Sequence, residues 1–508
     1  MPWRPECPWL PVKNIDSAGA LACAQLVYNF GVFYLIRYGE LALKSRQVRK
    51  RFLAQLEENL RAGLARKGIF HRLTVDWSRA FLESDDPRAG LVLSRCFGLS
   101  SFSRAERRGF GSIGDIIDEG ERIFSDRVAS KRFAVRARRR GSHPFSSQDI
   151  ERELGARLLA RSSGVDLDDP ELTCYLEVRG AEVWFFTEKT MGPGGLPVGT
   201  GKRVLLLYSG GFDSSVAAWM MLKKGSPVDF LFLNIGGAEH ERRAKQGASF
   251  LVEEWAGASD GFLYTVDFSG VIKGIKERVD RPYWNMVLKR CFYLAAWEIA
   301  RRKNYPAVVT GESLGQVSSQ TLSNLVALGE GATVPVMRPL LGLDKEEIIG
   351  LARKAGTYGI SAGLKEYCDL AGGHPVTSSD AERLDAHMRA LDRGLVEEAL
   401  SSLEITRLPA PPEDAEELKI DRIPEGALLV DLRDVAKYQA WHPEGALLAG
   451  YEELEAGLFP LEKGRVYVFY CDQALKSLDA ARVLRRMGFE AYSFKGGTKA
   501  LMKRVGEK

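Results

Sequence analysis

The sequence predicts a multidomain α/β protein with two N-terminal α+β units, a central domain on a parallel sheet and a compact C-terminal α/β domain. Strands and helices alternate from about residue 203 to 376, as they do in a parallel sheet with crossover helices. Short strands and helices alternate before this region, and two stretches rich in glycine or proline separate the parts. A chain of 508 residues, 45% hydrophobic and 27% charged, can bury several such cores.

The first N-terminal unit is predicted at 31–75, after an extension at 1–30. Phe33–Arg37 is an apolar run typical of a strand. A helix should follow, because apolar residues recur with a helical period at 48, 52, 53, 56, 60 and 64. Ala18–Ile36 also has the composition of a signal peptide or a weak membrane span, but Gln25 and Asn29 interrupt it.

The second N-terminal unit is predicted at 76–190. Its region contains the strand-like stretches "LTVDW", "RFAVRAR", "CYLEVRG" and "EVWFFTE" and a helix at Ser147–Arg161. "MGPGGLPVGTGK" then predicts a linker at 191–202.

The central domain is predicted at 203–400, with strands in "VDFLFLNIG" and "NYPAVVTGE". "RLPAPPED" predicts a second linker, placed at 401–415. The C-terminal domain, 416–508, should contain strands at Ala427–Asp431 and Val466–Tyr470 and a helix at Leu478–Met487.

Charge and cysteine content narrow the class of protein. The net charge is only +4, but Lys44–Arg51 holds five basic residues and Lys131–Arg140 holds six without an acid. The cysteines, at 7, 23, 96, 174, 291, 368 and 471, are odd in number and form no C-x-x-C pair. This pattern disfavours a disulfide framework or a structural zinc site and favours a reducing compartment, so we expect a cytoplasmic protein.

The stretch "VLLLYSGGFDSSVAAWMM", Val204–Met221, predicts a nucleotide site. A buried strand that ends in Ser-Gly-Gly and leads into a helix presents unpaired amides and the positive end of a helix dipole, which suits a phosphate. The lysine of a Walker A loop is missing, and Asp213 lies in the loop instead. Its carboxylate suits Mg²⁺ on phosphates. A glycine turn capped by a serine or aspartate is the plainer alternative.

The segment Ser209–Ser214 resembles the PP-loop, S-G-G-x-D-S, of ATP pyrophosphatases. The resemblance implies that the loop holds the leaving pyrophosphate while a substrate oxygen attacks the α-phosphorus of ATP. The product is an adenylate.

Further motifs resemble the ThiI-type tRNA 4-thiouridine synthetases. They are "GESLGQVSSQTLSNL" (311–325), "RPLLGLDKEEII" (338–349), "LNIGGAEH" (233–240), "RYGELALKS" (37–45) and "LSRCFGLSSFS" (93–103), the last similar to the family's THUMP domain. The resemblance runs from about residue 33 to the C-terminus. It implies a ferredoxin-like N-terminal domain, a THUMP RNA-binding domain, a PP-loop ATP pyrophosphatase domain and a rhodanese-like domain.

The family chemistry implies an ATP-dependent sulfurtransferase that adenylates uridine O4 at position 8 of tRNA and replaces the oxygen with sulfur. Asp213 and Lys345 would be catalytic, and Mg²⁺ would come with ATP and not from a protein-only site. The residues implied to bind ATP are Tyr208, Ser209, Gly210, Gly211, Phe212, Asp213, Ser214, Asn234, Gly311 and Gln320.

The sulfur would be carried by Cys471. "YCDQALKS" (470–477) resembles the active-site loop of rhodaneses, and "DLRDVAKYQAWHPEGAL" upstream is similar to their D-x-R…H-x-x-G-A segment. The loop departs from common rhodaneses in carrying Asp472 and a single cation, Lys476, which leaves the sulfur donor open. By resemblance, Cys368 forms a transient disulfide with Cys471 as sulfur is released. Cys96 and Cys291 are predicted to be buried structural thiols.

The N-terminal half is predicted to bind tRNA. Arg136, Arg138 and Arg140 alternate along a strand, so one face carries three guanidiniums suited to phosphates. The full set of predicted RNA-binding residues is Lys44, Arg46, Arg49, Lys50, Lys131, Arg132, Arg136, Arg138 and Arg140. A solvated charged face is the alternative for each cluster.

The expected partners are tRNA and a cysteine desulfurase, with no membrane. A thiamine-pathway sulfur carrier and a homodimer stay open. Two rival functions stay open as well. Another PP-loop tRNA-modifying enzyme would carry a glutaminase domain or a C-x-x-C pair, and neither occurs in this sequence. A sulfur-relay protein for thiamine thiazole synthesis would use the rhodanese domain alone.

Overall fold

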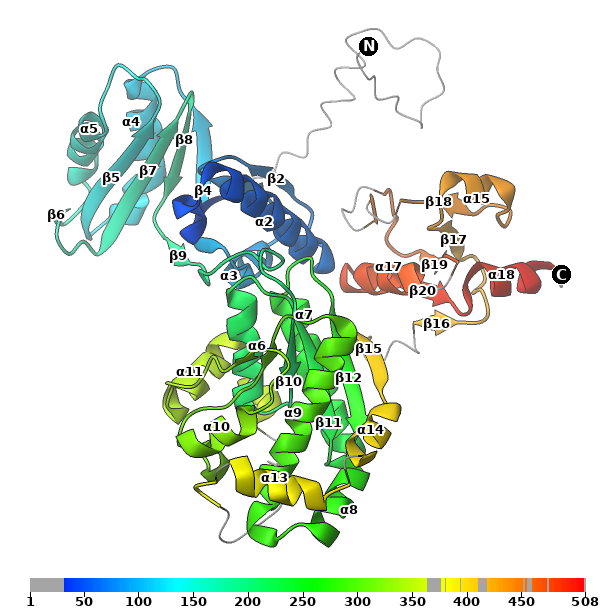
Figure 1. Ribbon diagram of the computed structural model, residues 1–508. Helices are drawn as coiled ribbons and strands as arrows, with labels where there is room; N and C mark the ends of the chain where they lie inside the picture. Colours follow the sequence, from blue (N-terminus) through cyan, green and yellow to red (C-terminus); the bar gives the residue numbers. More distant parts are fainter. Residues whose placement is uncertain are drawn as a thin grey trace.

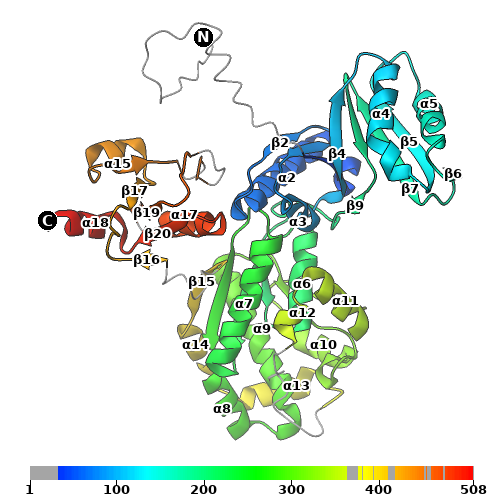
Figure 2. The same cartoon turned by 180° about the vertical axis from the view of Figure 1, so that it is seen from behind.

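A computed structural model shows three sheets in succession along the chain (Figure 1). It describes residues 32–362, 376–379, 381–392, 394–409, 418–450, 453–454, 459–472 and 475–506. Seen from opposite sides in Figure 1 and Figure 2, the C-terminal domain lies beside the N-terminal units and the central domain. Among the described residues, no helix is both long and apolar enough to cross a membrane.

The N-terminal units share one sheet of order β2-β3-β1-β4-β8-β7-β5-β6, with β9 paired to β4. Its elements are β1 (Phe33–Tyr38), η1 (Glu40–Leu43), α2 (Arg46–Arg66), β2 (Arg72–Val75), β3 (Ala80–Glu83), α3 (Ala89–Arg95), β4 (Leu99–Gly109), α4 (Ile113–Val128), β5 (Arg132–Arg140), α5 (Ser147–Leu159), β6 (Gly164–Val165), β7 (Leu172–Arg179), β8 (Glu182–Phe186) and β9 (Thr190–Met191). The strands predicted at Phe33 and Arg132 and the two predicted helices are confirmed. Their observed ends lie within about two residues of the predicted ones.

Strand β4 joins the two units (Figure 1). Its first part pairs with β1 as far as Ala105, and its last part, from Glu106, pairs with β8. A separate hydrophobic core lies on each side of this change. The boundary expected at 75/76 falls inside the first core, because β3 and α3 complete that core after the expected end. Residues 93–103, assigned to the THUMP unit from sequence, likewise lie in the first unit.

The central domain has a sheet of order β14-β13-β10-β11-β12-β15, parallel except for β15. Its elements are β10 (Val204–Leu207), α6 (Phe212–Lys223), β11 (Val228–Asn234), α7 (Gly237–Trp255), β12 (Gly261–Asp267), α8 (Ser269–Arg278), η2 (Arg281–Tyr283), α9 (Trp284–Lys303), β13 (Val308–Val309), η3 (Ser318–Gln320), α10 (Leu322–Gly329), β14 (Val336–Met337), α11 (Lys345–Ala355), α12 (Tyr358–Ser361), α13 (Ala381–Ala390), α14 (Gly394–Ser401) and β15 (Glu404–Leu408).

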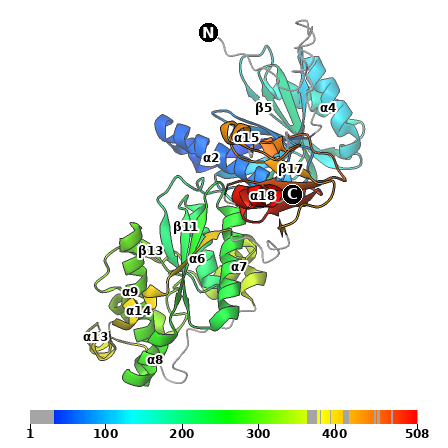
Figure 3. The same ribbon diagram turned by 90° about the vertical axis from the view of Figure 1, so that its right-hand side faces the viewer.

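Helices cover both faces of this sheet (Figure 3). Helices α6, α7 and α11 pack on one face, and α8, α9, α10, α13 and α14 pack on the other. The strand order reverses between β10 and β13, so the chain leaves the sheet to opposite sides there. Ligands of open parallel sheets bind at such a switch point, beyond the carboxyl ends of the strands.

Two segments predicted as linkers are partly built into the fold. Residues 404–408 of the stretch assigned to 401–415 form β15, which pairs with β12 and buries Leu408. The sequence did not indicate this strand, because the prolines that follow it are typical of a linker. In the 191–202 stretch, Val198 is buried and its carbonyl accepts a hydrogen bond from Asn59 Nδ2 at 3.0 Å. This segment therefore joins the first unit to the central domain as an ordered strap.

The first unit is docked on the central domain. Phe97 packs between Trp219 of α6 and Trp255 of α7, with ring centroids 5.6 and 5.0 Å away. The carboxylate of Glu254 on α7 binds Lys67 Nζ at 2.5 Å and also Arg95, both from the first unit. The contact combines a buried aromatic cluster with a shielded ion pair, so it resists separation of the two parts.

The C-terminal domain is a five-stranded parallel sheet of order β16-β20-β19-β17-β18. Its elements are β16 (Lys419–Ile420), β17 (Leu428–Asp431), α15 (Val435–Ala440), β18 (Leu447–Leu448), β19 (Val466–Tyr470), α17 (Leu475–Arg486), β20 (Glu490–Phe494) and α18 (Gly497–Gly506). The predicted strands and helix of this domain are confirmed.

Candidate active site

The loop from β10 to α6 has the form of an anion cradle. Gly210 has φ +82°, a conformation that disfavours any side chain, and Gly211 is the N-cap residue of α6. The two serines brace the turn: Ser209 Oγ accepts the amide of Gly211, and Ser214 Oγ donates to the Gly211 carbonyl. The amides of the first turn of α6 have no intrahelical acceptor and point out of the helix end. The cradle suits phosphate oxygens.

Three neighbours hold the loop in place. Ser361 Oγ donates to the carbonyl of Gly210 at 2.9 Å, and His240 Nε2 lies 2.9 Å from the carbonyl of Ser209. Burial lowers the pKa of His240, although the contact with Ser209 opposes this shift. Gly311, after β13, touches the loop so closely that a Cβ there would lie 2.7 Å from the carbonyl carbon of Asp213. The position admits only glycine without a shift of the loop.

Asp213 is the centre of the site, and side chains from two other segments converge on it. Lys345 Nζ lies 3.3 Å from its Oδ1, and Gln316 Nε2 donates to its Oδ2 at 2.9 Å. Lys345 is in the first turn of α11, which Asp344 begins with a capping box. Sequence reasoning selected Asp213 and Lys345 but missed Gln316, although it lies in the quoted stretch 311–325.

A buried carboxylate behind the site was also missed. Glu312 accepts hydrogen bonds from Tyr293 Oη at 2.5 Å and Arg338 Nε at 3.0 Å, and Lys289 Nζ lies 3.6 Å away. Burial opposes ionisation of Glu312, but Lys289, Tyr293 and Arg338 together lower its pKa. The network fixes the residue next to Gly311 and so fixes the loop that carries Gln316.

Three of the side chains predicted to bind ATP make hydrogen bonds to neighbouring parts of the protein. Tyr208 is buried, with its hydroxyl 3.3 Å from Ser215 Oγ. Asn234 Oδ1 accepts two amides of the turn that follows β11. Gln320 is buried, and its Oε1 accepts the amide of Ser313. Contact of these side chains with ATP stays a prediction.

Cys471 lies at the carboxyl end of β19. Its thiol is buried, 3.6 Å from the hydroxyl of Ser477, which pairs with Ser493 Oγ at 2.9 Å. The amide of Thr498 binds the Cys471 carbonyl at 3.0 Å. Desolvation raises the pKa of three buried thiols in the other domains to about 12, and these are Cys96, Cys174 and Cys291. Cys96 and Cys291 are buried, as predicted.

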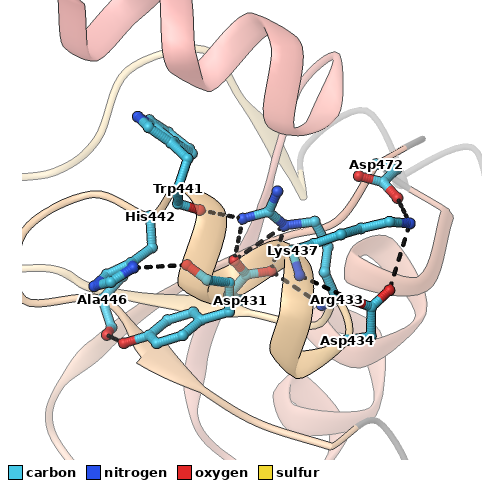
Figure 4. Close-up of polar contacts among 9 residues, drawn as sticks. Asp431, Arg433, Asp434, Lys437, Trp441, His442, Ala446 and Asp472 are labelled. Atoms are coloured by element: carbon cyan, nitrogen blue, oxygen red, sulfur yellow. Dashed lines mark hydrogen bonds and ion pairs between the residues drawn. The ribbon is translucent and has the colours of Figure 1, made fainter.

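The residues around the Cys471 loop form a dense ionic framework (Figure 4). Asp431 is fully buried and accepts two hydrogen bonds in parallel from Arg433, from Nε to Oδ1 and from Nη2 to Oδ2. Arg433 also donates to the Trp441 carbonyl at 2.6 Å. Asp472, next to the cysteine, pairs with Lys437 at 2.7 Å. Arg433 of the D-x-R segment also lies over the ring of Tyr470, directly before the cysteine, and the unusual Asp472 already has a cationic partner in Lys437.

Cys368 lies outside the described residues, at 363–375, and so does its predicted pairing with Cys471. In the part of the chain that the structure describes, no cluster of three or more His, Cys, Asp or Glu residues could hold a metal ion. At the loop, Asp213 alone offers a carboxylate, so a magnesium ion there would take most of its oxygen ligands from phosphates and water.

The predicted RNA-binding residues lie on the N-terminal units, and all are exposed except the half-buried Arg49. Arg138 makes no ion pair with described residues, whereas Arg132 pairs with Asp166 at 2.6 Å. Arg140 donates to Ser78 of the first unit. Arg49 of the first cluster donates to the carbonyl of Trp77, next to Ser78, so one residue of each cluster lies at this turn between the two units.

Comparisons with known proteins agree with this layout. Family models match the chain for the ThiI ferredoxin-like domain at 33–103, the THUMP domain at 112–188, "Thiamine biosynthesis protein (ThiI)" at 199–392 and the rhodanese-like domain at 414–504.

Curated relatives match nearly the whole chain. A tRNA sulfurtransferase of Pyrobaculum aerophilum is 39% identical over 91% of this chain and 96% of its own length. One of Thermoplasma volcanium is 34% identical over 90% and 95%. A crystal structure of a 4-thiouridine synthetase in complex with RNA and bound ATP aligns with a TM-score of 0.65 and 30% identity, covering 74% of this chain and 99% of the other.

Proposed function

Because this chain belongs to the tRNA sulfurtransferase family, we propose that it is an ATP-dependent tRNA sulfurtransferase that converts a uridine of tRNA to 4-thiouridine. The observation that carries the proposal is the Asp213 site: a phosphate cradle at the switch point of the sheet, with Lys345 and Gln316 converging on one carboxylate. Relatives named tRNA sulfurtransferase that match almost the full length support the use of tRNA, and the solved 4-thiouridine synthetase with RNA and bound ATP supports the use of ATP. By resemblance, the uridine is at position 8.

In the first half-reaction, O4 of the uracil attacks the α-phosphorus of ATP. An O–P bond forms, pyrophosphate leaves, and O4 becomes part of an AMP leaving group. The amides at the start of α6 would bind the departing phosphates, and Lys345 would stabilise charge on the α-phosphate. Asp213 would hold a magnesium ion, which neutralises phosphate charge when it is bound.

In the second half-reaction, a persulfide on Cys471 attacks C4 of the adenylated base. A C–S bond forms and AMP leaves. The thiolate of Cys368 then attacks Cys471 Sγ, so the S–S bond breaks, the sulfur stays on C4, and a Cys368–Cys471 disulfide forms. A dithiol reductant must reduce this disulfide before the next turnover. The end of β19 and the start of α17 would favour the sulfur anion.

The proposal also includes the sulfur donor and the residues that bind the RNA. A cysteine desulfurase would load Cys471, and the basic residues of the N-terminal units would bind tRNA phosphates. A second role in sulfur transfer for thiamine thiazole synthesis is favoured by the description of the family model at 199–392, since that description names thiamine biosynthesis.

The test uses the full chain with unmodified tRNA, Mg-ATP and a persulfide donor, followed by mass analysis of the nucleosides. We expect 4-thiouridine from the wild type and none from Asp213→Asn or Cys471→Ser. Cys471→Ser should still release pyrophosphate, because adenylation precedes sulfur transfer. Non-reducing peptide mapping after one turnover should find Cys368 linked to Cys471. Thiolation by Asp213→Asn at the wild-type rate would refute the assignment.

A further inference from the structure

The turn between β2 and β3 brings together arginines from both N-terminal units. Arg49 of α2 lies over the Trp77 ring, 4.4 Å from its centroid, and donates to the Trp77 carbonyl. Arg140 of β5 and Arg179 of β7 both donate to Ser78 Oγ. We call this region the junction surface, and its cationic and aromatic members are Arg37, Arg49, Trp77, Arg79, Arg140 and Arg179.

One buried carboxylate at the junction surface serves three arginines. Glu177 of β7 is only 4% exposed. Arg79 Nε lies 3.1 Å from its Oε1 and Arg179 Nη2 lies 2.7 Å from the same oxygen. Arg37 Nη2 is 3.9 Å from Oε2. A second acid, Asp76, accepts a hydrogen bond from Ser78 Oγ at 3.4 Å. Two carboxylates cannot balance the five arginines of the junction surface, so positive charge remains in excess at this point.

Two guanidinium N–H groups here are buried without a hydrogen-bond partner among the described residues: Nη2 of Arg37 and Nε of Arg49. Arg37 is 9% exposed. Burial lowers the pKa of Arg37 to about 10, and Arg79, Arg138 and Arg179 add to this effect while Glu177 opposes it. A buried donor without an acceptor is costly, and an oxyanion with several acceptor oxygens would satisfy it.

We propose that the junction surface binds a backbone phosphate of the tRNA on Arg37, Arg79 and Arg179, with a neighbouring unpaired base stacked on Trp77. Phosphate has the charge and the acceptor oxygens that Glu177 cannot supply to three arginines at once. Trp77 is 39% exposed, unusual for an indole outside a binding surface, and Arg49 already stacks on it. This inference rests on the proposed function only for the identity of the RNA.

The test measures binding of unmodified tRNA without ATP or a persulfide donor, at several salt concentrations. Arg79→Gln should weaken binding about tenfold and reduce the log–log salt slope by about 0.7 to 0.9. Trp77→Ala should weaken binding and leave the slope unchanged, because stacking releases no counterions. Arg301→Gln is the control: this exposed arginine is on α9 of the central domain, outside the predicted RNA-binding residues, and is paired with Glu298 at 2.7 Å, so its loss should change neither quantity.

Glu177→Gln distinguishes phosphate binding from a purely structural role, because the two roles predict different changes in the affinity for tRNA. If the arginines bind phosphate, removal of their competing carboxylate should tighten tRNA binding and steepen the salt slope. If the cluster only stabilises the sheet, the same variant should bind tRNA more weakly or equally. Equal slopes for the wild type and Arg79→Gln would overturn the proposal while leaving thiolation intact. A wild type that fails to bind tRNA would overturn both this proposal and the proposed function.

Discussion

Replacement of Glu254 by glutamine tests whether the RNA-binding units are held rigidly on the catalytic domain. Its carboxylate is 11% exposed, and its partners Lys67 and Arg95 are 24% and 26% exposed. Fully exposed pairs contribute at most about 1 kcal/mol, and removing one partner of a buried pair costs about 3 to 5 kcal/mol. For these shielded but not fully buried pairs we expect a loss of about 2 kcal/mol, a factor of about 30 in the equilibrium for local opening.

Hydrogen exchange measures that opening directly. The amides of α3 and of the C-terminal turn of α7 should exchange about 30 times faster in Glu254→Gln. Thiolation should lose kcat/KM for tRNA while the Kd for tRNA stays near the wild-type value, because the RNA surface itself is intact. Glu253→Gln is the control: its carboxylate is 3.6 Å from Lys67 Nζ, and the change should be smaller. Equal exchange rates in all three proteins would refute the rigid docking.

The remaining predictions concern the Asp213 site. Lys345→Met should slow pyrophosphate release at unchanged tRNA affinity, because it removes the cation beside Asp213; release at the wild-type rate would show that the lysine is only a surface residue. Gly311→Ala should abolish adenylation, since its Cβ would lie 2.7 Å from backbone atoms of Asp213 and Ser214, whereas Gly342→Ala, with no atom within 4 Å of its Cβ, should be silent. Burial lowers the pKa of His240, so the folded protein keeps this imidazole neutral at pH values where the unfolded chain, with a pKa of about 6.5, already binds a proton; stability is therefore lost as pH falls from about 6.5 toward the folded value. The free energy of unfolding of the wild type should therefore decline as pH falls below about 6.5, and the decline should be weaker in His240→Gln; the same decline in both proteins would contradict the assignment.

The local parts of the site were predictable from sequence. Val204–Leu207 is a run of apolar residues, so it had to be a buried strand, and Ser-Gly-Gly after it had to be a turn before the apolar start of α6. This interpretation places Asp213 in the first turn of the helix, so its role at the phosphate site could be predicted. Lys345 could be selected only through the family resemblance, because nothing in its own neighbourhood indicates that it reaches a carboxylate 132 positions away.

Residues whose role depends on distant contacts were not predictable. Glu312 and Glu254 look like ordinary acids in the sequence, and their importance comes from the cations that the fold brings to them. The unit boundary was placed too early for a related reason. Strand β4 continues without a break from one sheet partner to the next, so no glycine or proline marks the point where the core changes.

Helix α7 connects the features that matter for selecting a nucleotide. At its first turn His240 contacts the carbonyl of Ser209 in the phosphate loop, and at its last turn Glu254 holds Lys67 and Arg95 of the first unit. The helix has 19 residues, so its ends are about 28 Å apart at 1.5 Å per residue. A straight helix does not change its length, and Phe97 fixes its C-terminal end against α6 as well. Under the proposed function, an RNA held on the N-terminal units would present nucleotides at a fixed separation to Asp213, and we therefore expect the position of the modified uridine to depend on geometry more than on base sequence.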